Sequence, residues 1–228
     1  MTQAEVFAGQ LVAAGLDADD AADKRMLFQR VLAAWRPDGR DSTSAAWWVP
    51  GRLEVFGTHT DYAGGRSLVA AVPRGFVLLS ARRADGRIRV ADAGAGAASD
   101  DNGVNVDPYA PPWQFRGWRH YVEVTAARLA RNFPGASLGA EIVFASDLPR
   151  AAGMSSSSAL VVGTATALID AGRLRERGEW RENIRSTVDE AGYLACIENG
   201  RTFGTLTGDT GVGTHGGSED HAAMVAGA

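Results

Sequence analysis

The chain has 228 residues, of which 45% are hydrophobic and 22% are charged, and its formal net charge is −4. This balance excludes a disordered or fibrous protein and allows a sizeable buried core. The basic residues form no stripe along the sequence, so nucleic acid is not expected as a partner.

The cysteine count and the lengths of the apolar runs bear on where in the cell the protein is expected. Cys196 is the only cysteine, which excludes an intramolecular disulfide and fits a reducing environment. No apolar run reaches the ~18 residues of a membrane span, and no cationic start precedes an apolar run as in a secretory signal. The sequence therefore predicts a cytoplasmic protein that does not enter a membrane.

The first 36 residues show the apolar spacing of helices. An acidic cluster at residues 17–23 predicts a break between two helices, with a capping residue at the start of the second. A turn-rich connector follows at residues 36–44. Asp85-Gly86 is placed for a hairpin turn. The strands expected in this part of the chain are residues 53–56, 67–72, 76–82 and 87–91.

Helical patterns dominate the second half of the chain. Residues 93–107 are rich in Gly, Ala and Asp and predict an exposed loop. One further strand is expected at residues 138–145. The helices expected here are residues 113–133, 155–171 and 179–198. Strands clustered early and helices clustered late predict an α+β protein of two layers rather than a doubly wound sheet.

One segment, residues 50–62, combines residue types that suit the binding of a polyhydroxylated molecule. It brings together Arg52, His59 and Asp61 beside a glycine. A carboxylate is a strong acceptor for hydroxyl groups, and a guanidinium is always charged. Outside such a motif, Arg52 would be a surface ion-pair partner and Asp61 would cap the next segment.

A second segment, residues 148–159, is a loop of small residues that leads into a helix. Small side chains let backbone N–H groups approach phosphate oxygens, and the start of a helix adds a partial positive charge. Serine hydroxyls can also donate to phosphates or bind Mg²⁺. The alternative is a serine-rich linker, against which the apolar residues on both sides argue. Together the two segments predict a small-molecule kinase.

The two segments resemble motifs of the GHMP kinase superfamily, and in particular of its galactokinase branch. The matching residues of the first are Gly51-Arg52, Gly57, His59-Thr60-Asp61-Tyr62 and Gly64-Gly65. Those of the second are Pro149, Gly153 and Ser155-Ser156-Ser157, and residues 217–221 are similar to a third motif that carries an Asp. The resemblance implies the fold of the GHMP kinase N-terminal domain, with a mixed sheet and packed helices, and a kinase that uses ATP and Mg²⁺.

The resemblance also implies a division of the chain. Residues 1–44 would be an N-terminal helical segment and linker, and residues 45–228 the domain that binds the substrate and the phosphates of ATP. Members of the superfamily continue into a ferredoxin-like C-terminal domain. The sequence stops at Ala228, soon after the third motif. We therefore expect that second domain to be largely missing and the chain to be a truncated product or a fragment.

Two residues are expected to be catalytic because they match the family motifs. Arg52 would lie beside the transferred phosphoryl group and neutralise its charge. Asp220 would lie beside the attacking hydroxyl and accept or orient its proton. Read alone, Asp220 also fits an ordinary helix N-terminus with acidic residues in its first turn.

The resemblance names a set of sugar-binding residues as well. Thr58 stands where the family has a Glu, and the loss of a charge-assisted hydrogen bond weakens sugar discrimination by roughly 1.5–3 kcal/mol. Galactose is therefore not assumed as the substrate. The residues expected to bind the sugar are Thr58, His59, Asp61, Tyr62 and Gly217.

ATP and Mg²⁺ are expected at the serine-rich loop. Ala151 stands where the family has Gly, and its Cβ would constrain the loop. Mg²⁺ is expected at Ser157 and Glu198, although Glu198 also fits a solvated carboxylate at a helix end. The residues expected to bind ATP are Ala151, Ala152, Gly153, Met154, Ser155, Ser156, Ser157 and Ser158.

The function expected from the sequence is a galactokinase-like sugar kinase that transfers the γ-phosphoryl group of ATP to a sugar hydroxyl. Thr58, Ala151 and the early end of the chain favour an alternative, a catalytically impaired sugar- or ATP-binding sensor or an inactive fragment of such a kinase. The expected partners are a small-molecule sugar and ATP. The sequence does not identify the sugar, the hydroxyl or the oligomeric state.

Overall fold

The computed structural model describes residues 1–36, 44–57, 60–94, 103–110, 115–149, 152–213 and 216–227, with the backbone alone at residues 62 and 63. The connector predicted at residues 36–44 lies almost wholly outside these ranges. Within them, every helix is too short or too polar to cross a bilayer.

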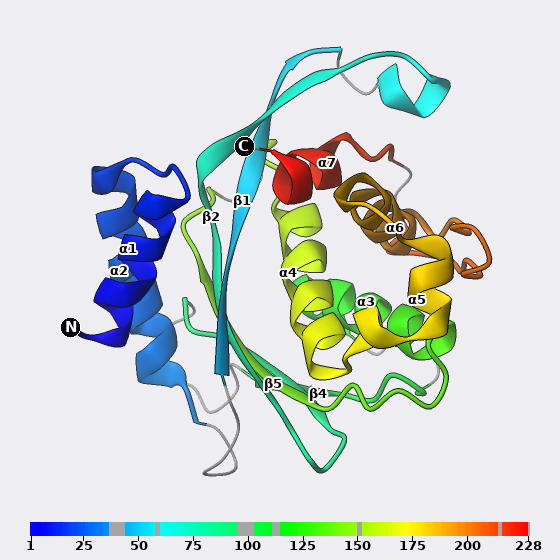
Figure 1. Cartoon of the computed structure of the whole chain (residues 1–228), viewed down its shortest axis with the longest axis horizontal. Coiled ribbons are helices and arrows are strands. Elements are labelled where there is room, and N and C mark those ends of the chain that lie inside the picture. Colours follow the sequence, from blue (N-terminus) through cyan, green and yellow to red (C-terminus); the bar gives the residue numbers. More distant parts are fainter. Residues whose placement is uncertain are drawn as a thin grey trace.

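A five-stranded mixed sheet forms the centre of the described structure (Figure 1). Its strands lie in the order β1-β2-β5-β3-β4. β3 and β5 run parallel, and the other neighbouring strands run antiparallel. The strands are β1 (Ser44–Phe56), β2 (Leu68–Arg82), β3 (Ile88–Asp92), β4 (Gly103–Val106) and β5 (Ala140–Ser146).

Helices cover both faces of the sheet. Figure 1 shows α1 and α2 on one face and α3 to α7 on the other. α4 is the central helix of the second layer, because side chains around most of its circumference are buried against the sheet, α3, α6 and α7. The helices are α1 (Gln3–Ala13), α2 (Ala18–Ala34), α3 (Trp118–Asn132), α4 (Ser156–Ala171), α5 (Gly178–Asn183), α6 (Thr187–Asn199) and α7 (Glu219–Ala226).

The N-terminal helices form a hairpin on the outer face of the sheet. The predicted break is confirmed, because Asp17 caps α2 with its side chain. α1 begins with a capping box formed by Thr2 and Glu5. The rings of Phe7 and Phe28 stack with their centroids 4.5 Å apart. This hairpin buries its apolar side against β2 and β5.

The predicted α+β class with a mixed sheet is confirmed, but two of the predicted strands are one. Residues 67–72 and 76–82 both belong to β2, a single strand of 15 residues. The sequence pattern predicted no strand at the intervening residues 73–75. In the structure Pro50 pairs with Gly75 and Arg52 pairs with Ala71, so residues 72–74 of β2 lie opposite Gly51 alone in an irregularity of the register.

The hairpin predicted at Asp85-Gly86 is wrong. The chain turns there, but β2 pairs with β5, and β3 pairs with β4 and β5. β5 is buried along almost its whole length and lies between β2 and β3 in the sheet. The loop predicted at residues 93–107 contains β4, and residues 95–102 lie outside the described ranges.

The helix predicted at residues 179–198 is also wrong, because it is two helices. The backbone of Ile184 is extended and ends α5. The side chain of Ser186 accepts a hydrogen bond from the backbone N–H of Asp189 and so starts α6. The apolar periodicity continues across this break, which is why the sequence pattern did not reveal it.

Replacing Gly75 by Ala is expected to lower the free energy of unfolding by about 1–3 kcal/mol, the usual cost of overpacking. A Cβ at this position of β2 would lie 2.1 Å from the carbonyl oxygen of Val49, which is a backbone atom and cannot rotate away. Urea unfolding followed by circular dichroism measures the effect.

The matched control is Gly9→Ala in α1, where the new Cβ would meet nothing within 4 Å. Ala favours the helix by roughly 0.5–1 kcal/mol over Gly. Equal effects of the two substitutions would contradict the close approach of β1 and β2 at Gly75.

Candidate active site

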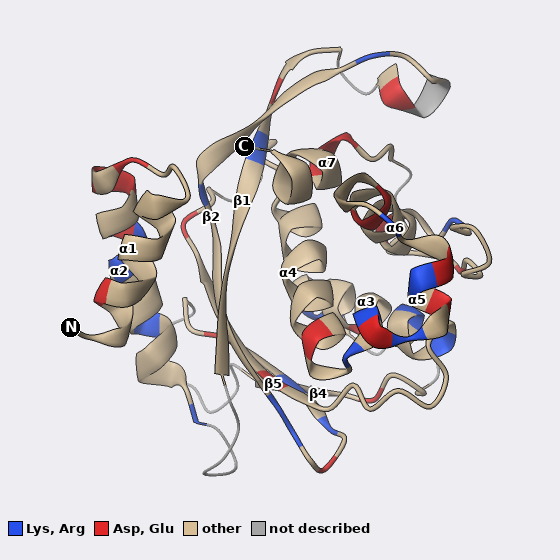
Figure 2. Ribbon diagram, in the orientation of Figure 1, with Lys and Arg blue, Asp and Glu red and all other residues tan. Residues whose placement is uncertain are grey.

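Arg52 projects from β1 into a buried position where several acidic groups meet. Only 5% of the residue is exposed. Its Nε donates a hydrogen bond to Oδ1 of Asp220, and its Nη2 lies 3.5 Å from Oε1 of Glu219. Figure 2 shows the basic segment of β1 beside the acidic start of α7. A buried guanidinium needs such partners because an uncompensated charge is costly to bury.

The serine-rich loop lies against the same arginine. The backbone N–H of Arg52 donates to the carbonyl oxygen of Met154 at 3.3 Å, and its Nη1 donates to the carbonyl oxygen of Gly153 at 3.3 Å. The approach depends on Gly51, since a Cβ there would lie 2.9 Å from the carbonyl oxygen of Met154. β1 therefore holds the loop by its backbone and by the side chain of Arg52.

Asp220 occupies the first turn of α7 and completes the cluster. Its Oδ2 accepts a hydrogen bond from the hydroxyl of Ser158 at 3.1 Å. Burial raises the pKa of Asp220, but hydrogen bonds from the Ser155 hydroxyl and Arg52 outweigh burial and lower it below its usual value. The carboxylate is thus ionised at neutral pH. Arg52, Ser158 and Asp220 therefore converge in the structure, and the catalytic roles expected for Arg52 and Asp220 stay predictions.

The serine run forms the first turn of α4, so the linker alternative is wrong. α4 begins at Ser156, and Ser158 is already buried. Gly153 has a φ of +69° and Ser155 a φ of +52°, so the loop reaches the helix through left-handed backbone. Among the described residues no side chain caps this helix end at Ser155. Its first-turn N–H groups therefore suit an anion such as a phosphate.

Three more residues are expected to bind ATP, and the structure describes two of them. Ala152 lies in the bend that precedes Gly153 and is exposed. Ser157 lies in the first turn of α4 and is partly buried. Ala151 lies outside the described residues.

Asp61 joins the sugar-binding segment to α7. Its Oδ2 accepts hydrogen bonds from the backbone N–H groups of Ser218 at 2.9 Å and Glu219 at 3.2 Å. A Cβ at Gly217 would lie 1.5 Å from that oxygen, so this position requires glycine. Asp61 therefore caps a helix that begins 158 residues later rather than the next segment.

Three residues expected to bind the sugar have no described side chain. Thr58 and His59 lie outside the described residues, and only the backbone of Tyr62 is described. Asp61 and Gly217 are brought together. The roles of all five in sugar binding stay predictions.

Glu198 is buried at the end of α6, so it is not a solvated carboxylate. Its Oε2 lies 3.0 Å from Nε2 of His221, which is also buried. The sequence reading gave His221 no role. Across the described part of the chain, no three His, Cys, Asp or Glu side chains are grouped as metal ligands. Glu198 as a Mg²⁺ ligand stays a prediction.

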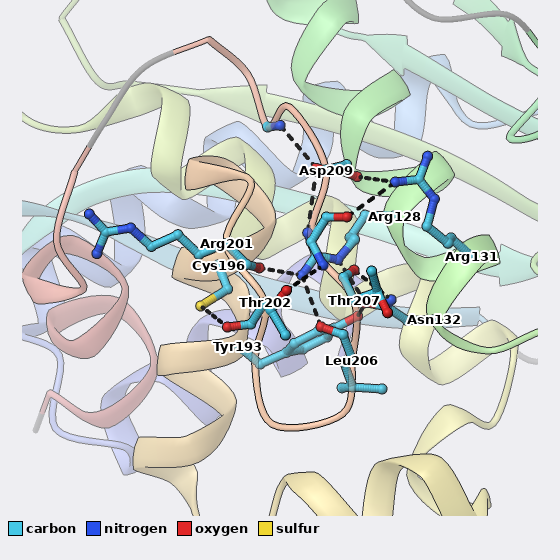
Figure 3. A network of polar contacts seen from close by, with 12 residues as sticks. Arg128, Arg131, Asn132, Tyr193, Cys196, Arg201, Thr202, Leu206, Thr207 and Asp209 are labelled. Carbon is cyan, nitrogen blue, oxygen red and sulfur yellow. Dashed lines mark hydrogen bonds and ion pairs between the residues drawn. The ribbon is translucent and has the colours of Figure 1, made fainter.

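A segment between α6 and α7 is anchored by an arginine that the sequence reading did not single out (Figure 3). Arg128 of α3 is fully buried. It donates to the side-chain oxygen of Asn132 at 2.7 Å and to the carbonyl oxygen of Arg201 at 2.5 Å, and its Nη1 lies 3.4 Å from Oδ1 of Asp209. The only feature of the sequence that could have indicated its burial is its position on the apolar face of the predicted helix. These contacts fix residues 200–209 against α3.

A cavity of about 550 Å³ lies between the start of α3 and the anchored segment. It is lined by residues 115–117, His120, Tyr121 and residues 210–213. Burial raises the pKa of Tyr121, and the charge of Glu198 raises it further. Val212, which lines the cavity, donates its backbone N–H to the carbonyl oxygen of Glu198 at 2.9 Å, so the cavity lies close to Glu198. Its size is that of a small-molecule pocket.

Two family profiles match the chain. Residues 39–82 match the galactokinase galactose-binding signature, and residues 120–189 match the N-terminal domain of GHMP kinases. The first covers β1, η1 (Thr60–Ala63) and β2, which carry Arg52 and Asp61. The second covers the serine-rich loop.

Curated relatives are galactokinases. The chain is 34% identical over 132 residues to a galactokinase of Roseiflexus sp. (strain RS-1), which covers 58% of this chain and 32% of the relative. It is 36% identical over 149 residues to a galactokinase of Streptomyces coelicolor, which covers 65% of this chain and 36% of the relative. The chain thus matches about a third of the length of these relatives.

Solved structures share the fold. Lactococcus lactis galactokinase, crystallised with galactose, superposes with a TM-score of 0.60 at 20% identity, over 79% of this chain and 41% of that one. The mevalonate kinase of Methanococcus jannaschii gives a TM-score of 0.54 at 15% identity, over 83% of this chain and 52% of that one.

Replacing Arg128 by Met is expected to lower the free energy of unfolding by about 3 kcal/mol or more, because buried acceptors lose their charged partner. Arg131→Met is the control. Arg131 also approaches Asp209, at 3.5 Å, but its side chain is 52% exposed, so a loss of about 0–1 kcal/mol is expected. Chemical unfolding of both variants checks this, and equal losses would exclude the anchoring role.

The stability of the protein is expected to depend on pH through Asp220. Because its pKa is lowered in the folded state, the ionised carboxylate contributes stability that is present above the unfolded-state value of about 4. That contribution is lost as the pH falls through the folded-state pKa. The difference in unfolding free energy between wild type and Asp220→Asn should therefore stay constant above about pH 5 and shrink as the pH falls from about 5 to about 3. A difference that is constant over this range would contradict the lowered pKa.

Proposed function

Because the chain belongs to the GHMP kinase superfamily, we propose that it is a galactokinase-like sugar kinase that transfers the γ-phosphoryl group of ATP to a sugar hydroxyl. The observation that carries this proposal is the meeting of Arg52, Ser158 and Asp220 at the start of α4. These residues come from three distant parts of the sequence and combine a cation, a hydroxyl and a carboxylate.

Phosphoryl transfer depends mainly on positioning and on the neutralisation of charge. Asp220 is ionised, so its carboxylate accepts a hydrogen bond from the attacking sugar hydroxyl and directs the oxygen toward the phosphorus. As the new P–O bond forms, the bond to the bridging oxygen breaks and ADP leaves. The hydroxyl proton passes to Asp220 or to solvent. Arg52 stabilises the charge on the transferred group.

The ATP phosphates are assigned to the loop and the first turn of α4. The uncapped N–H groups of this turn and the hydroxyls of Ser156 and Ser157 are donors of the required kind. Mg²⁺ fits here by chemistry, since Ser157 and the carboxylate of Glu198 offer oxygen ligands. When bound, Mg²⁺ supplies further neutralisation of phosphate charge.

The sugar is assigned to the segment around Asp61, beside α7. Oδ2 of Asp61 already accepts two backbone hydrogen bonds, which fixes the orientation of the carboxylate. His59, Thr58, Tyr62 and Gly217 complete the proposed site. The galactokinase signature makes galactose the first sugar to test.

A second candidate function is a sensor that binds sugar or ATP without turnover. Thr58 favours it, because the neutral hydroxyl replaces the carboxylate that the family uses to hold its sugar. Calorimetry measures ligand binding and the coupled assay measures release of ADP. A sensor binds its ligand tightly and releases no ADP.

Coupled release of ADP from Mg²⁺-ATP across a panel of sugars is expected to identify a substrate. Asp220→Ala should lower the turnover rate by about 100-fold or more, as expected for the loss of a proton-handling group. Asp85→Asn is the control, because Asp85 pairs with Arg83 at the β2–β3 turn. Turnover that survives Asp220→Ala, or the absence of binding of both ADP and sugar, would remove this proposal.

A further inference from the structure

Lys24 is a buried ammonium group on the side of the sheet opposite to the candidate active site. It lies on α2 and is 1% exposed. Its Nζ forms an ion pair with Oδ2 of Asp147 and lies 5.2 Å from the centre of the Trp48 ring. Lysine is almost never fully buried unless it is paired. The contact with Asp147 is therefore the reason that this side chain can be accommodated.

Asp147 is the first residue after β5, and its other oxygen is also engaged. Oδ1 accepts a hydrogen bond from the backbone N–H of Gly75 at 2.7 Å. The backbone N–H of Asp147 donates to the carbonyl oxygen of Gly75 at 3.2 Å. Lys24 is thus paired with the carboxylate of Asp147. The same carboxylate attaches the residue after β5 to Gly75 of β2.

The residues after Asp147 lead directly into the phosphate-binding loop. The backbone N–H of Leu148 donates to the hydroxyl of Ser146 at 3.1 Å. A Cβ at Gly51 would lie 2.6 Å from the Leu148 side chain. Further along the loop, the carbonyl oxygen of Met154 accepts the hydrogen bond of the Arg52 backbone N–H. The loop therefore has two fixed ends, one at Asp147 and one at Arg52.

We propose that Lys24 is a positioning residue for the phosphate-binding loop. It acts through Asp147 and makes the N-terminal hairpin part of the nucleotide-binding machinery. The inference concerns the same site as the proposed sugar kinase. The expected effect on nucleotide binding rests on that proposed function. It assigns a role to a segment that neither matched family profile covers.

A first experiment measures the position of the loop without any ligand. Hydrogen exchange of the backbone amides of residues 152–158 should become faster in Lys24→Met and in Asp147→Asn. Val31→Ala is the matched control, because Val31 is fully buried on the same helix and packs in the apolar cluster under the hairpin. It should weaken the hairpin and leave the exchange of these amides unchanged. Equal acceleration by Val31→Ala would reduce Lys24 to a packing role and overturn the inference.

A second experiment measures binding by calorimetry with ADP and with galactose. Lys24→Met should weaken the affinity for ADP by about tenfold or more, since small displacements of positioning groups have large effects. The affinity for galactose should stay within about twofold. Lys24→Arg should restore ADP affinity, because it keeps the charge that faces Asp147. Wild-type ADP affinity in Lys24→Met would overturn the inference.

The two proposals fail in different ways. If the wild-type chain binds neither ADP nor sugar, the proposed kinase function fails, and hydrogen exchange alone decides the role of Lys24. If the wild type binds ADP and Lys24→Met binds it equally well, only the role of Lys24 fails. If Lys24→Met does not fold, Asp147→Asn and Lys24→Arg provide the same comparison. Asp147→Asn should weaken the affinity for ADP, and Lys24→Arg should leave it unchanged.

Discussion

The burial of one guanidinium governs the arrangement of the candidate site. Arg52 is surrounded by protein on β1, and a charge in that position must be matched by acceptors. The carboxylate of Asp220 and the carbonyl oxygen of Gly153 provide them. These acceptors belong to α7 and to the loop before α4. The electrostatic requirement of a single side chain therefore brings three segments to one point, and the ionised state of Asp220 follows from the same contact.

Local sequence signals identified residues that meet in the structure, whereas they predicted the pairing of the strands poorly. The motif around Arg52, the serine run and Asp220 could be recognised because they resemble motifs of the GHMP kinase superfamily. Their convergence is found in the structure. The two N-terminal helices were also predictable, since Asp17 is a strong capping residue. Each of these signals is contained within a few neighbouring residues.

What the sequence did not reveal depends on contacts between distant residues. The pairing of β5 with both β2 and β3 leaves no mark in the periodicity of any one strand, so the Asp85-Gly86 turn was misread as a hairpin. The sequence pattern gave no role to Arg128 or Lys24, both of which are buried in the structure. Their burial becomes reasonable only once Asp209 and Asp147, which lie 81 and 123 residues further along the chain, are placed beside them.

The separation between Arg52 and Asp220 has a consequence for biosynthesis. The two residues lie 168 positions apart. At translation rates of about 5–20 residues per second, Arg52 is made roughly ten to thirty seconds before its carboxylate partner. Until Gly153 and then Asp220 have been made, the guanidinium lacks these acceptors and stays hydrated. β1, an edge strand of the sheet, should therefore reach its final position late, after α7 has been made.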